Sequence, residues 1–159
     1  SGVLVFAKKA DVKERLQNEW KTLVFERRYV ALVEGEVKKT SGTITSWLKE
    51  SKTHLMYSSK RPGDGKKAVT HYKVIRANRS FSLLDVRLET GRKNQIRVHM
   101  KDIGHPVVGD KKYGATSKAI GRLGLHARVL AFKHPTTGET LRFETPIPEA
   151  FLFPFQSEN

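Results

Sequence analysis

The pattern of apolar and polar positions changes its period several times along the chain. An apolar run opens the sequence at residues 3–7 and has the composition of a buried strand. Asp11 then stands where a helix N-cap is expected, and apolar residues recur after it at helical spacing: Val12, Leu16, Trp20 and Leu23. These two segments predict a strand followed by an amphipathic helix.

A long strand is predicted at residues 24–37, because alternate positions there are apolar. It would place Tyr29, Ala31 and Val33 on one face of a sheet. Residues 38–67 are rich in lysine, serine and threonine and contain the turn signal Arg-Pro-Gly-Asp-Gly, so they predict a loop-rich stretch.

A second helix is predicted at residues 94–103, with Ile96, Met100 and Ile103 turned inward and a Gly-His-Pro sequence ending it. The tail at 146–155 is punctuated by proline and rich in phenylalanine, which predicts packed irregular chain. Four further segments predict strands: 68–77, 81–89, 125–133 and 141–144.

Strands therefore follow one another directly, with two helices inserted, instead of alternating regularly with helices. This order predicts an α+β fold with a mainly antiparallel mixed sheet and a few helices packed on it. A length of 159 residues predicts a single domain, 1–159. An apolar run so close to residue 1, without an initiator methionine, indicates a domain truncated at its N-terminus.

The charge balance narrows the function. Thirty basic residues against 16 acidic ones give a net charge of +14, which is typical of a protein that binds a polyanion. A generally solvated basic surface and a membrane-surface protein are the alternatives, but no basic amphipathic helix of the membrane-lying type is present. No cysteine occurs, and no signal peptide or apolar run of about 20 residues is seen. We expect a cytoplasmic monomer that binds RNA and no membrane.

The densest candidate for chemistry lies at residues 88–100, where a strand, a glycine turn and the start of a helix carry several cations. Gly91 allows a sharp turn, and Arg92 stands at the mouth of the helix with Arg97 just inside it. A guanidinium fork at that position suits a carboxylate or a phosphate. The alternative is an ordinary solvated helix face.

A second candidate is Tyr29, which follows Arg27 and Arg28 on the long predicted strand. An aromatic ring beside two cations can stack an unpaired base while the cations hold phosphates. The alternative is a tyrosine that simply belongs to the core. The six histidines lack the close spacing of zinc ligands, and no phosphate-binding or dinucleotide-binding loop is present, so no metal or cofactor is expected.

Several ordered motifs together resemble the RluA-type family of ribosomal large-subunit pseudouridine synthases. The start of the chain resembles the end of the family motif H-R-L-D-x-x-T-S-G-hydrophobic-A-K, and the strand around Tyr29 resembles K-x-Y-x-A-x-V-x-G. The glycine turn and helix resemble T-G-R-x-H-Q-I-R-x-H. The matching stretches are 1–8, 27–35, 90–99, 104–114 and 122–135.

The resemblance implies an enzyme that isomerises uridine to pseudouridine in structured RNA, without cofactor or metal, after the uridine has left its stack. It implies that Tyr29 contacts the base and assists proton removal, and that Arg97 pairs with a catalytic aspartate, with Arg92 as the second choice for that pairing. Leu125 would line the uracil pocket. The resemblance also places further residues at the RNA substrate: Arg92, Asn94, Gln95 and His126.

Two departures from the family pattern matter. Asn94 stands where the family has histidine, which affects the expected RNA contacts. The family aspartate falls a few residues before Ser1, and no aspartate of this chain occupies a matching position: Asp11, Asp64, Asp85, Asp102 and Asp110. We therefore expect the chain to bind ribosomal or transfer RNA without catalysing the reaction. A non-catalytic RNA-binding module and a basic domain that docks a protein partner are the alternatives.

Overall fold

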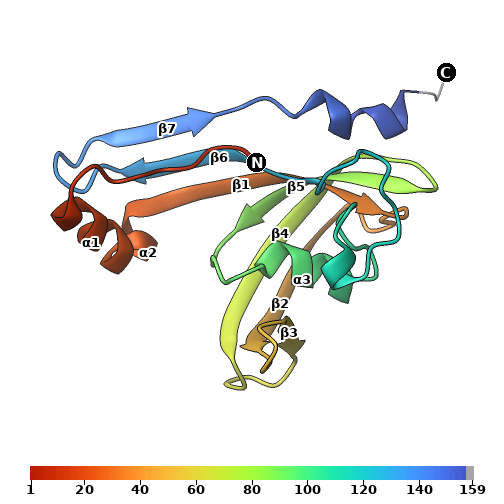
Figure 1. The fold of residues 1–159 in the computed structure, drawn as a ribbon, viewed down its shortest axis with the longest axis horizontal. Helices are drawn as coiled ribbons and strands as arrows, with labels where there is room; N and C mark the ends of the chain where they lie inside the picture. The colour runs from red at the N-terminus through yellow and green to blue at the C-terminus, as the bar shows by residue number, and fades with distance from the viewer. Residues whose placement is uncertain (157–159) are drawn as a thin grey trace.

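The computed structural model describes residues 1–156 as one bent sheet with helices on it (Figure 1). The strands are β1 (Val24–Glu34), β2 (Ser41–Glu50), β3 (Met56–Ser59), β4 (Lys66–Ala77), β5 (Phe81–Leu88), β6 (Leu125–Lys133) and β7 (Thr140–Glu144). The helices are α1 (Ala10–Asn18), α2 (Trp20–Leu23) and α3 (Gln95–Asp102), with 3₁₀ turns η1 (Lys111–Tyr113), η2 (Glu149–Phe151) and η3 (Phe153–Phe155).

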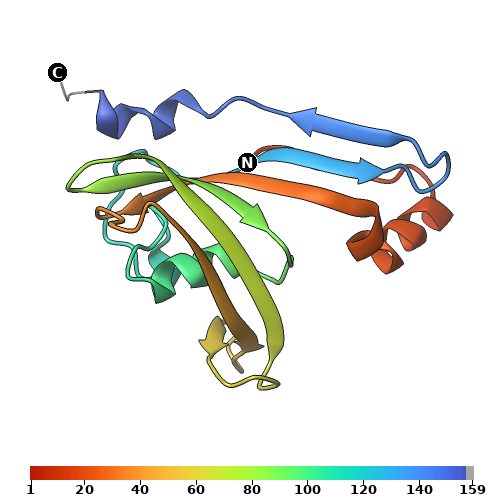
Figure 2. The same ribbon diagram turned by 180° about the vertical axis from the view of Figure 1, so that it is seen from behind.

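The seven strands form a single sheet in the order β3-β2-β4-β5-β1-β6-β7, and every pair of neighbouring strands is antiparallel. The prediction of an α+β fold with a mainly antiparallel sheet is confirmed. The sheet is strongly bent, so that β2, β3 and β4 run away from the plane of β1, β6 and β7 (Figures 1 and 2). None of the helices in residues 1–156 is both long enough and apolar enough to cross a membrane.

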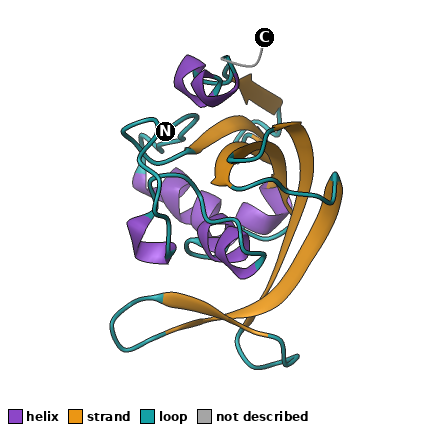
Figure 3. Ribbon diagram, turned by 90° about the vertical axis from the view of Figure 1, so that its right-hand side faces the viewer, coloured by secondary structure: helices purple, strands orange, loops and turns teal. Residues whose placement is uncertain are grey.

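Strand β1 lies inside the sheet and is buried on both faces. Ala31 and Val33 pack with Ile96 and Met100 of α3 on one face. The intervening residues pack on the other face against the C-terminal tail, where Phe151 and Phe155 are fully buried. The α-helices and the C-terminal turns accordingly lie on opposite sides of the sheet (Figure 3). The predicted face of Tyr29, Ala31 and Val33 is confirmed, as is the packed tail.

The predictions for three segments are wrong in part. Residues 38–67 contain the strands β2 and β3. These strands lie near the edge of the sheet, and most of their polar side chains occupy positions that are at least partly exposed. Residues 3–7 form no strand: Leu4 and Phe6 are 73% and 81% exposed, and Gly2 alone makes an isolated parallel bridge to Ala127. Helix α1 has Lys9 at its N-cap, so Asp11 lies in the first turn, where its charge favours the helix dipole.

Helix α3 is fixed to the sheet by a buried histidine. His99 is fully buried, with Nε2 2.8 Å from the hydroxyl of Ser46 and Nδ1 2.7 Å from the hydroxyl of Thr70. A neutral imidazole supplies one donor and one acceptor, and both hydroxyls can take either role. Burial lowers the pKa of His99 to about 4. The neutral ring therefore joins α3 to β2 and β4.

This burial predicts a loss of stability in mild acid. Because the unfolded chain binds a proton at His99 near pH 6.5 and the folded chain does not, the stabilisation is present above that pH and falls as the pH drops toward about 4. The loss attributable to His99 should reach about 3 kcal/mol. Urea unfolding of wild type and His99→Gln across this range measures it. The unfolding free energy of His99→Gln should depend less on pH than that of the wild type. His54→Asn, which leaves His99 in place, should keep the wild-type pH dependence. Equal pH dependence in wild type and His99→Gln would contradict the assignment.

Candidate active site

Six of the seven predicted site residues line one cavity on the helical face of the sheet. The cavity has a volume of about 190 Å³ and lies where β1, the end of β5, the start of α3 and the start of β6 meet. Tyr29 faces it from β1, beside its β5 and β6 partners Val86 and Ala127. The lining residues are Tyr29, Leu88, Arg92, Asn94, Gln95, Ile96, Arg97 and Leu125.

Arg97 is held by a carboxylate from this chain. Its Nε and Nη2 donate to the two oxygens of Asp110, each over 2.8 Å, in a bidentate ion pair. The Asp110 side chain is 1% exposed and the Arg97 side chain 23% exposed, so the pair is largely removed from water. The hydrogen bond to Asp110 raises the pKa of Arg97. Asp110 fixes the guanidinium and does not line the cavity.

Two further residues hold the same guanidinium. The ring of Tyr113 lies beneath it, with the centroid 4.9 Å from Cζ, a cation–π contact. Asn94 accepts a hydrogen bond from Nη1 over 3.2 Å, and its amide nitrogen donates to the Tyr113 hydroxyl over 3.2 Å. Asn94 has a φ of 56°, in the left-handed region that asparagine tolerates better than most residues. The start of α3 and η1 are thereby joined around Arg97.

Gln95 is buried and has hydrogen bonds to both ends of its amide. Its oxygen accepts from the hydroxyl of Thr90 and the backbone N–H of Arg92, and its nitrogen donates to Val69 and Thr70 on β4. These bonds fix the turn between β5 and α3 against the sheet. Gln95 lines the cavity, but its polar atoms already have partners within the protein.

The charged side chains close to Tyr29 in the cavity are positive, because they are arginines. Burial raises the pKa of its phenol, and the charge of Arg27 acts against that shift. Burial lowers the pKa of Arg27, and the nearby charge of Arg92 lowers it further. In residues 1–156 neither arginine forms an ion pair with a carboxylate; both donate to backbone oxygens, Arg27 to Glu89 and Arg92 to Lys67. The cavity therefore has a local excess of positive charge.

Two predicted contributors lie elsewhere. Arg28 points to the other face of β1, where it pairs with Asp85, so it does not share the site with Tyr29. His126 is buried beneath the tail, with hydrogen bonds to Ser1 and Thr145 and its ring edge-on to Phe151. The structure does not bring His126 into the cavity.

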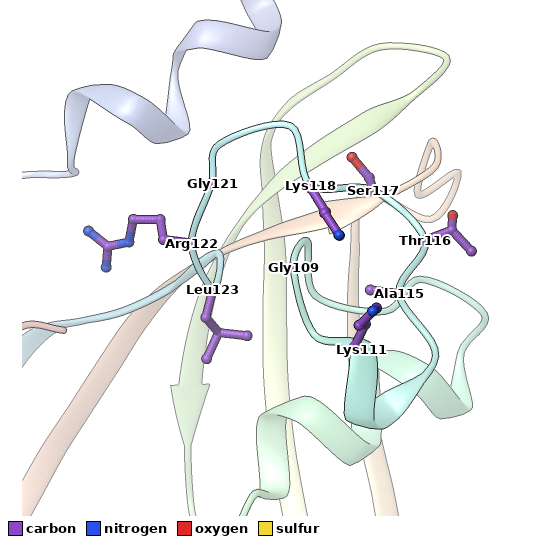
Figure 4. Close-up of a pocket in the computed structure, with 9 residues that line it drawn as sticks. All are labelled: Gly109, Lys111, Ala115, Thr116, Ser117, Lys118, Gly121, Arg122 and Leu123. Atoms are coloured by element: carbon purple, nitrogen blue, oxygen red, sulfur yellow. The ribbon is translucent and has the colours of Figure 1, made fainter.

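A separate, larger hollow of about 540 Å³ lies over the loop at residues 109–123 (Figure 4). Lys118 points into the space between the arms of this loop, whereas Arg122 points away from it, over the ring of Phe151. The hollow has no residue in common with the cavity at Tyr29. Across the described part of the chain, no group of three or more His, Asp or Glu side chains is placed to hold a metal ion.

A sequence model of the family described as RNA pseudouridylate synthase matches residues 1–102, which include Tyr29, Arg92 and Arg97. The chain belongs to the RNA pseudouridylate synthase family.

Individual relatives agree with this membership. The chain is 44% identical, over 94% of its length and 49% of the relative, to YlyB of Bacillus subtilis, named an uncharacterized RNA pseudouridine synthase. It is 35% identical to ribosomal large subunit pseudouridine synthase D of Zymomonas mobilis, over 94% of the chain and 50% of the relative. The chain thus spans about half the length of these curated relatives.

A solved pseudouridylate synthase domain has the same fold. Human RNA pseudouridylate synthase domain containing 1 superposes with a TM-score of 0.72 at 29% identity, over 88% of this chain and 62% of the human one. The fold on which the cavity is built is therefore that of the family.

The sequence pattern missed two residues that shape this candidate site: Asp110 and Tyr113. It named Arg27 and Arg28 together as cations beside Tyr29, and the period of two along β1 could have separated them, because it puts Arg27 and Tyr29 on the same face and Arg28 on the other. No local signal marked Asp110 or Tyr113, because their contacts to Arg97 depend on how the loop after α3 folds back against that helix.

The Arg97–Asp110 pair predicts a specific pattern of stability changes. Arg97→Ala leaves the buried Asp110 without a partner and should cost about 3–5 kcal/mol of unfolding free energy. The double variant Arg97→Met/Asp110→Leu removes both charges and should recover most of that loss. Urea unfolding at neutral pH measures both. If the double variant is as unstable as Arg97→Ala, lost packing and not the unpaired carboxylate is responsible.

Proposed function

We propose that a polypeptide containing this chain isomerises uridine to pseudouridine in structured RNA. The observation that carries the proposal is the convergence of Tyr29, Arg97 and Leu125 on one cavity. These residues come from β1, α3 and β6, which are distant in sequence. Membership of the family and the net charge of +14 support the same conclusion.

The reaction needs a site that holds a single base outside its helix. The bond between ribose C1′ and uracil N1 breaks, the uracil turns, and a bond forms between C1′ and C5. The proton on C5 is lost and N1 gains one, so no redox partner is needed. We infer that the uridine is flipped into the cavity at Tyr29, with Leu125 against the uracil.

Tyr29 suits two tasks at this position. Burial raises the pKa of the phenol, so the ring is neutral at physiological pH and can stack on the base. Proton removal from C5 then requires the hydroxyl to release its own proton to solvent as it accepts another, and N1 of the uracil takes up one proton in return. The charge of Arg27 opposes the pKa shift and so favours the phenolate during that transfer.

Arg97 is proposed to hold the nucleophilic carboxylate in place. Asp110 takes the edge formed by Nε and Nη2, and Asn94 takes one N–H of Nη1. With five N–H groups in all, the guanidinium keeps donors for a second carboxylate on the cavity side. The family motif puts that aspartate upstream of Ser1. We therefore propose that residues 1–159 bind RNA and that turnover requires the upstream aspartate.

The proposed substrate is large-subunit ribosomal RNA, with transfer RNA as the alternative, acted on in the cytoplasm by a monomer. Support comes from relatives at 33–35% identity that are named ribosomal large subunit pseudouridine synthase D, in Haemophilus influenzae and Zymomonas mobilis. No cofactor or metal is proposed, because the isomerisation needs a carboxylate, a proton acceptor and a positioned base.

A non-catalytic RNA-binding module is the second candidate. It is favoured by the pairing of Arg97 with Asp110, which neutralises the cation, and by the lack of an aspartate among the residues that line the cavity. The two candidates share RNA binding and differ in turnover.

RNA binding by residues 1–159 should depend steeply on salt. Each phosphate contact releases condensed counterions, so even a few contacts should lower the affinity about 10-fold or more between 50 and 200 mM salt. Fluorescence anisotropy with a labelled stem–loop RNA measures this. Binding that does not respond to salt would argue against a phosphate-based interaction.

Turnover should require the upstream motif. A polypeptide extended before Ser1 through H-R-L-D-x-x-T should release tritium from RNA that carries uridine labelled at C5, without added metal, and residues 1–159 alone should not. Two variants of the extended protein test the site: the motif aspartate changed to alanine, and Tyr29→Phe. Both should lose turnover while Tyr29→Phe keeps RNA affinity, because the ring remains. Activity of residues 1–159 alone would mean that the catalytic acid is misplaced.

A further inference from the structure

The turn between β5 and α3 brings together two arginines, Arg27 and Arg92, whose partners within residues 1–156 are all neutral. Nη2 of Arg27 donates to the backbone oxygen of Glu89 over 2.9 Å, and Nε of Arg92 donates to the backbone oxygen of Lys67 over 3.0 Å. Each guanidinium is thus fixed in direction without being neutralised. Both retain N–H groups for another acceptor.

Gly91 makes this arrangement possible. A Cβ atom at Gly91 would lie 2.4 Å from Nη1 of Arg27, closer than atoms can approach. Gly91 is not among the glycines with positive φ, so its backbone conformation is open to other residues. The missing side chain at Gly91 leaves the space that the guanidinium of Arg27 fills, and a Cβ atom there would displace the guanidinium from this position.

Several other arginines on or against the sheet are matched with acids, and Arg76 of β4, like Arg27 and Arg92, donates to a backbone oxygen. Arg28 pairs with Asp85, Arg97 with Asp110, and Arg142 with Glu26. Burial is the main cause that lowers the pKa of Arg27; Tyr29 acts in the opposite direction, and the like charge of Arg92 adds a smaller lowering. The two arginines are therefore like charges near each other in a partly desolvated place. Such a pair is stabilised when an anion binds between its members.

The position of the two arginines indicates which anion. Arg92 lines the cavity proposed for the uridine, and Arg27 lines an adjoining hollow of about 220 Å³ that also contains Trp20. The two spaces share Tyr29 and Leu88 in their walls. A nucleic-acid chain that puts one base in the first space and the next base in the second must carry its phosphate past the boundary between them.

We propose that Arg27 and Arg92 form a clamp for the phosphodiester that joins the target uridine to a neighbouring nucleotide. This inference rests on the proposed function and names the part of the RNA that these residues recognise. Guanidinium groups form paired, charge-assisted hydrogen bonds with phosphate oxygens, and phosphate contacts fix the register of a nucleic acid on a protein. The clamp sets the register of the strand, so that the uridine and no other nucleotide lies over Tyr29.

The test uses residues 1–159 and a labelled five-nucleotide RNA with one central uridine, at low salt. In two further RNAs a methylphosphonate replaces the phosphate on the 5′ or the 3′ side of the uridine, which removes one charge. For the wild type, one of the two replacements should weaken binding about 10-fold, as expected for the loss of a hydrogen bond to a charged group. Arg92→Gln and Arg27→Gln should already bind the unmodified RNA more weakly, and that same methylphosphonate replacement should weaken their binding little further.

Arg79→Gln is the matched control. Arg79 is exposed in the turn before β5, at the opposite end of that strand from Gly91, and its replacement removes the same charge. The salt slope should fall by about one unit for a variant that loses a phosphate contact, but Arg79→Gln should keep the full methylphosphonate penalty. If Arg27→Gln fails to fold, Arg92→Gln alone carries the test, because Arg92 is only half-buried.

The outcomes separate the clamp from the proposed function. Salt-dependent binding with no penalty at either position in the wild type, or with the same penalty in wild type and both clamp variants, overturns the clamp and leaves RNA binding intact. Complete absence of RNA binding overturns both. Retention of the penalty in Arg79→Gln together with its loss in Arg92→Gln supports the clamp.

Discussion

Strand β1 is covered on both faces because its side chains alternate between them from Arg27 to Val33, beyond the irregularity at Val24–Glu26. Its position between β5 and β6 leaves no polar edge, and the four residues Val30, Ala31, Leu32 and Val33 are at most 1% exposed. A shift of one residue in its register would exchange the face that meets α3 with the face that meets the C-terminal tail. The same alternation puts Tyr29 and Arg27 together toward the cavity and sends Arg28 to Asp85 on the opposite face. The core and the site are therefore specified by one register.

The charges of the molecule divide into a matched and an unmatched set, and this division has a physical basis. A buried carboxylate without a partner costs several kcal/mol, so Asp110 must be paired, and the fork of Arg97 pairs it with two hydrogen bonds. The pair fixes Arg97 and closes the loop after α3. Arg27 and Arg92 are half-buried, and each donates to a backbone oxygen in place of an acid. A cation that must bind a ligand has to be left without an internal acid, and the cost of doing so is lowest near the surface.

The sequence allowed most of the fold to be predicted wherever one face of an element is buried and the other is wet. Helix α3 and strand β6 followed from periodicity, since Ile96 and Met100 pack inward as expected. Strand β2 was missed because half of its ten residues are Ser, Thr or Lys, and its strand conformation comes from pairing with β4 and β3. The exposed run at residues 3–7 was misread for the opposite reason, because apolar composition alone does not show what covers it.

The candidate site was less predictable than the fold. A motif identifies residues, but it does not show which of their donors and acceptors already form hydrogen bonds within the protein. The fork of Arg97 was expected to suit a carboxylate, and it holds one, yet the acid comes from Asp110, 13 residues further along the chain. Asn94, considered from the sequence only as a contact for RNA, also binds Arg97 and Tyr113. A left-handed backbone at Asn94 brings its amide to that point, so the asparagine that replaces the family histidine also serves the turn. The local conformation of the chain and the electrostatics of the site are thus set by the same residue, and a substitution there changes both together.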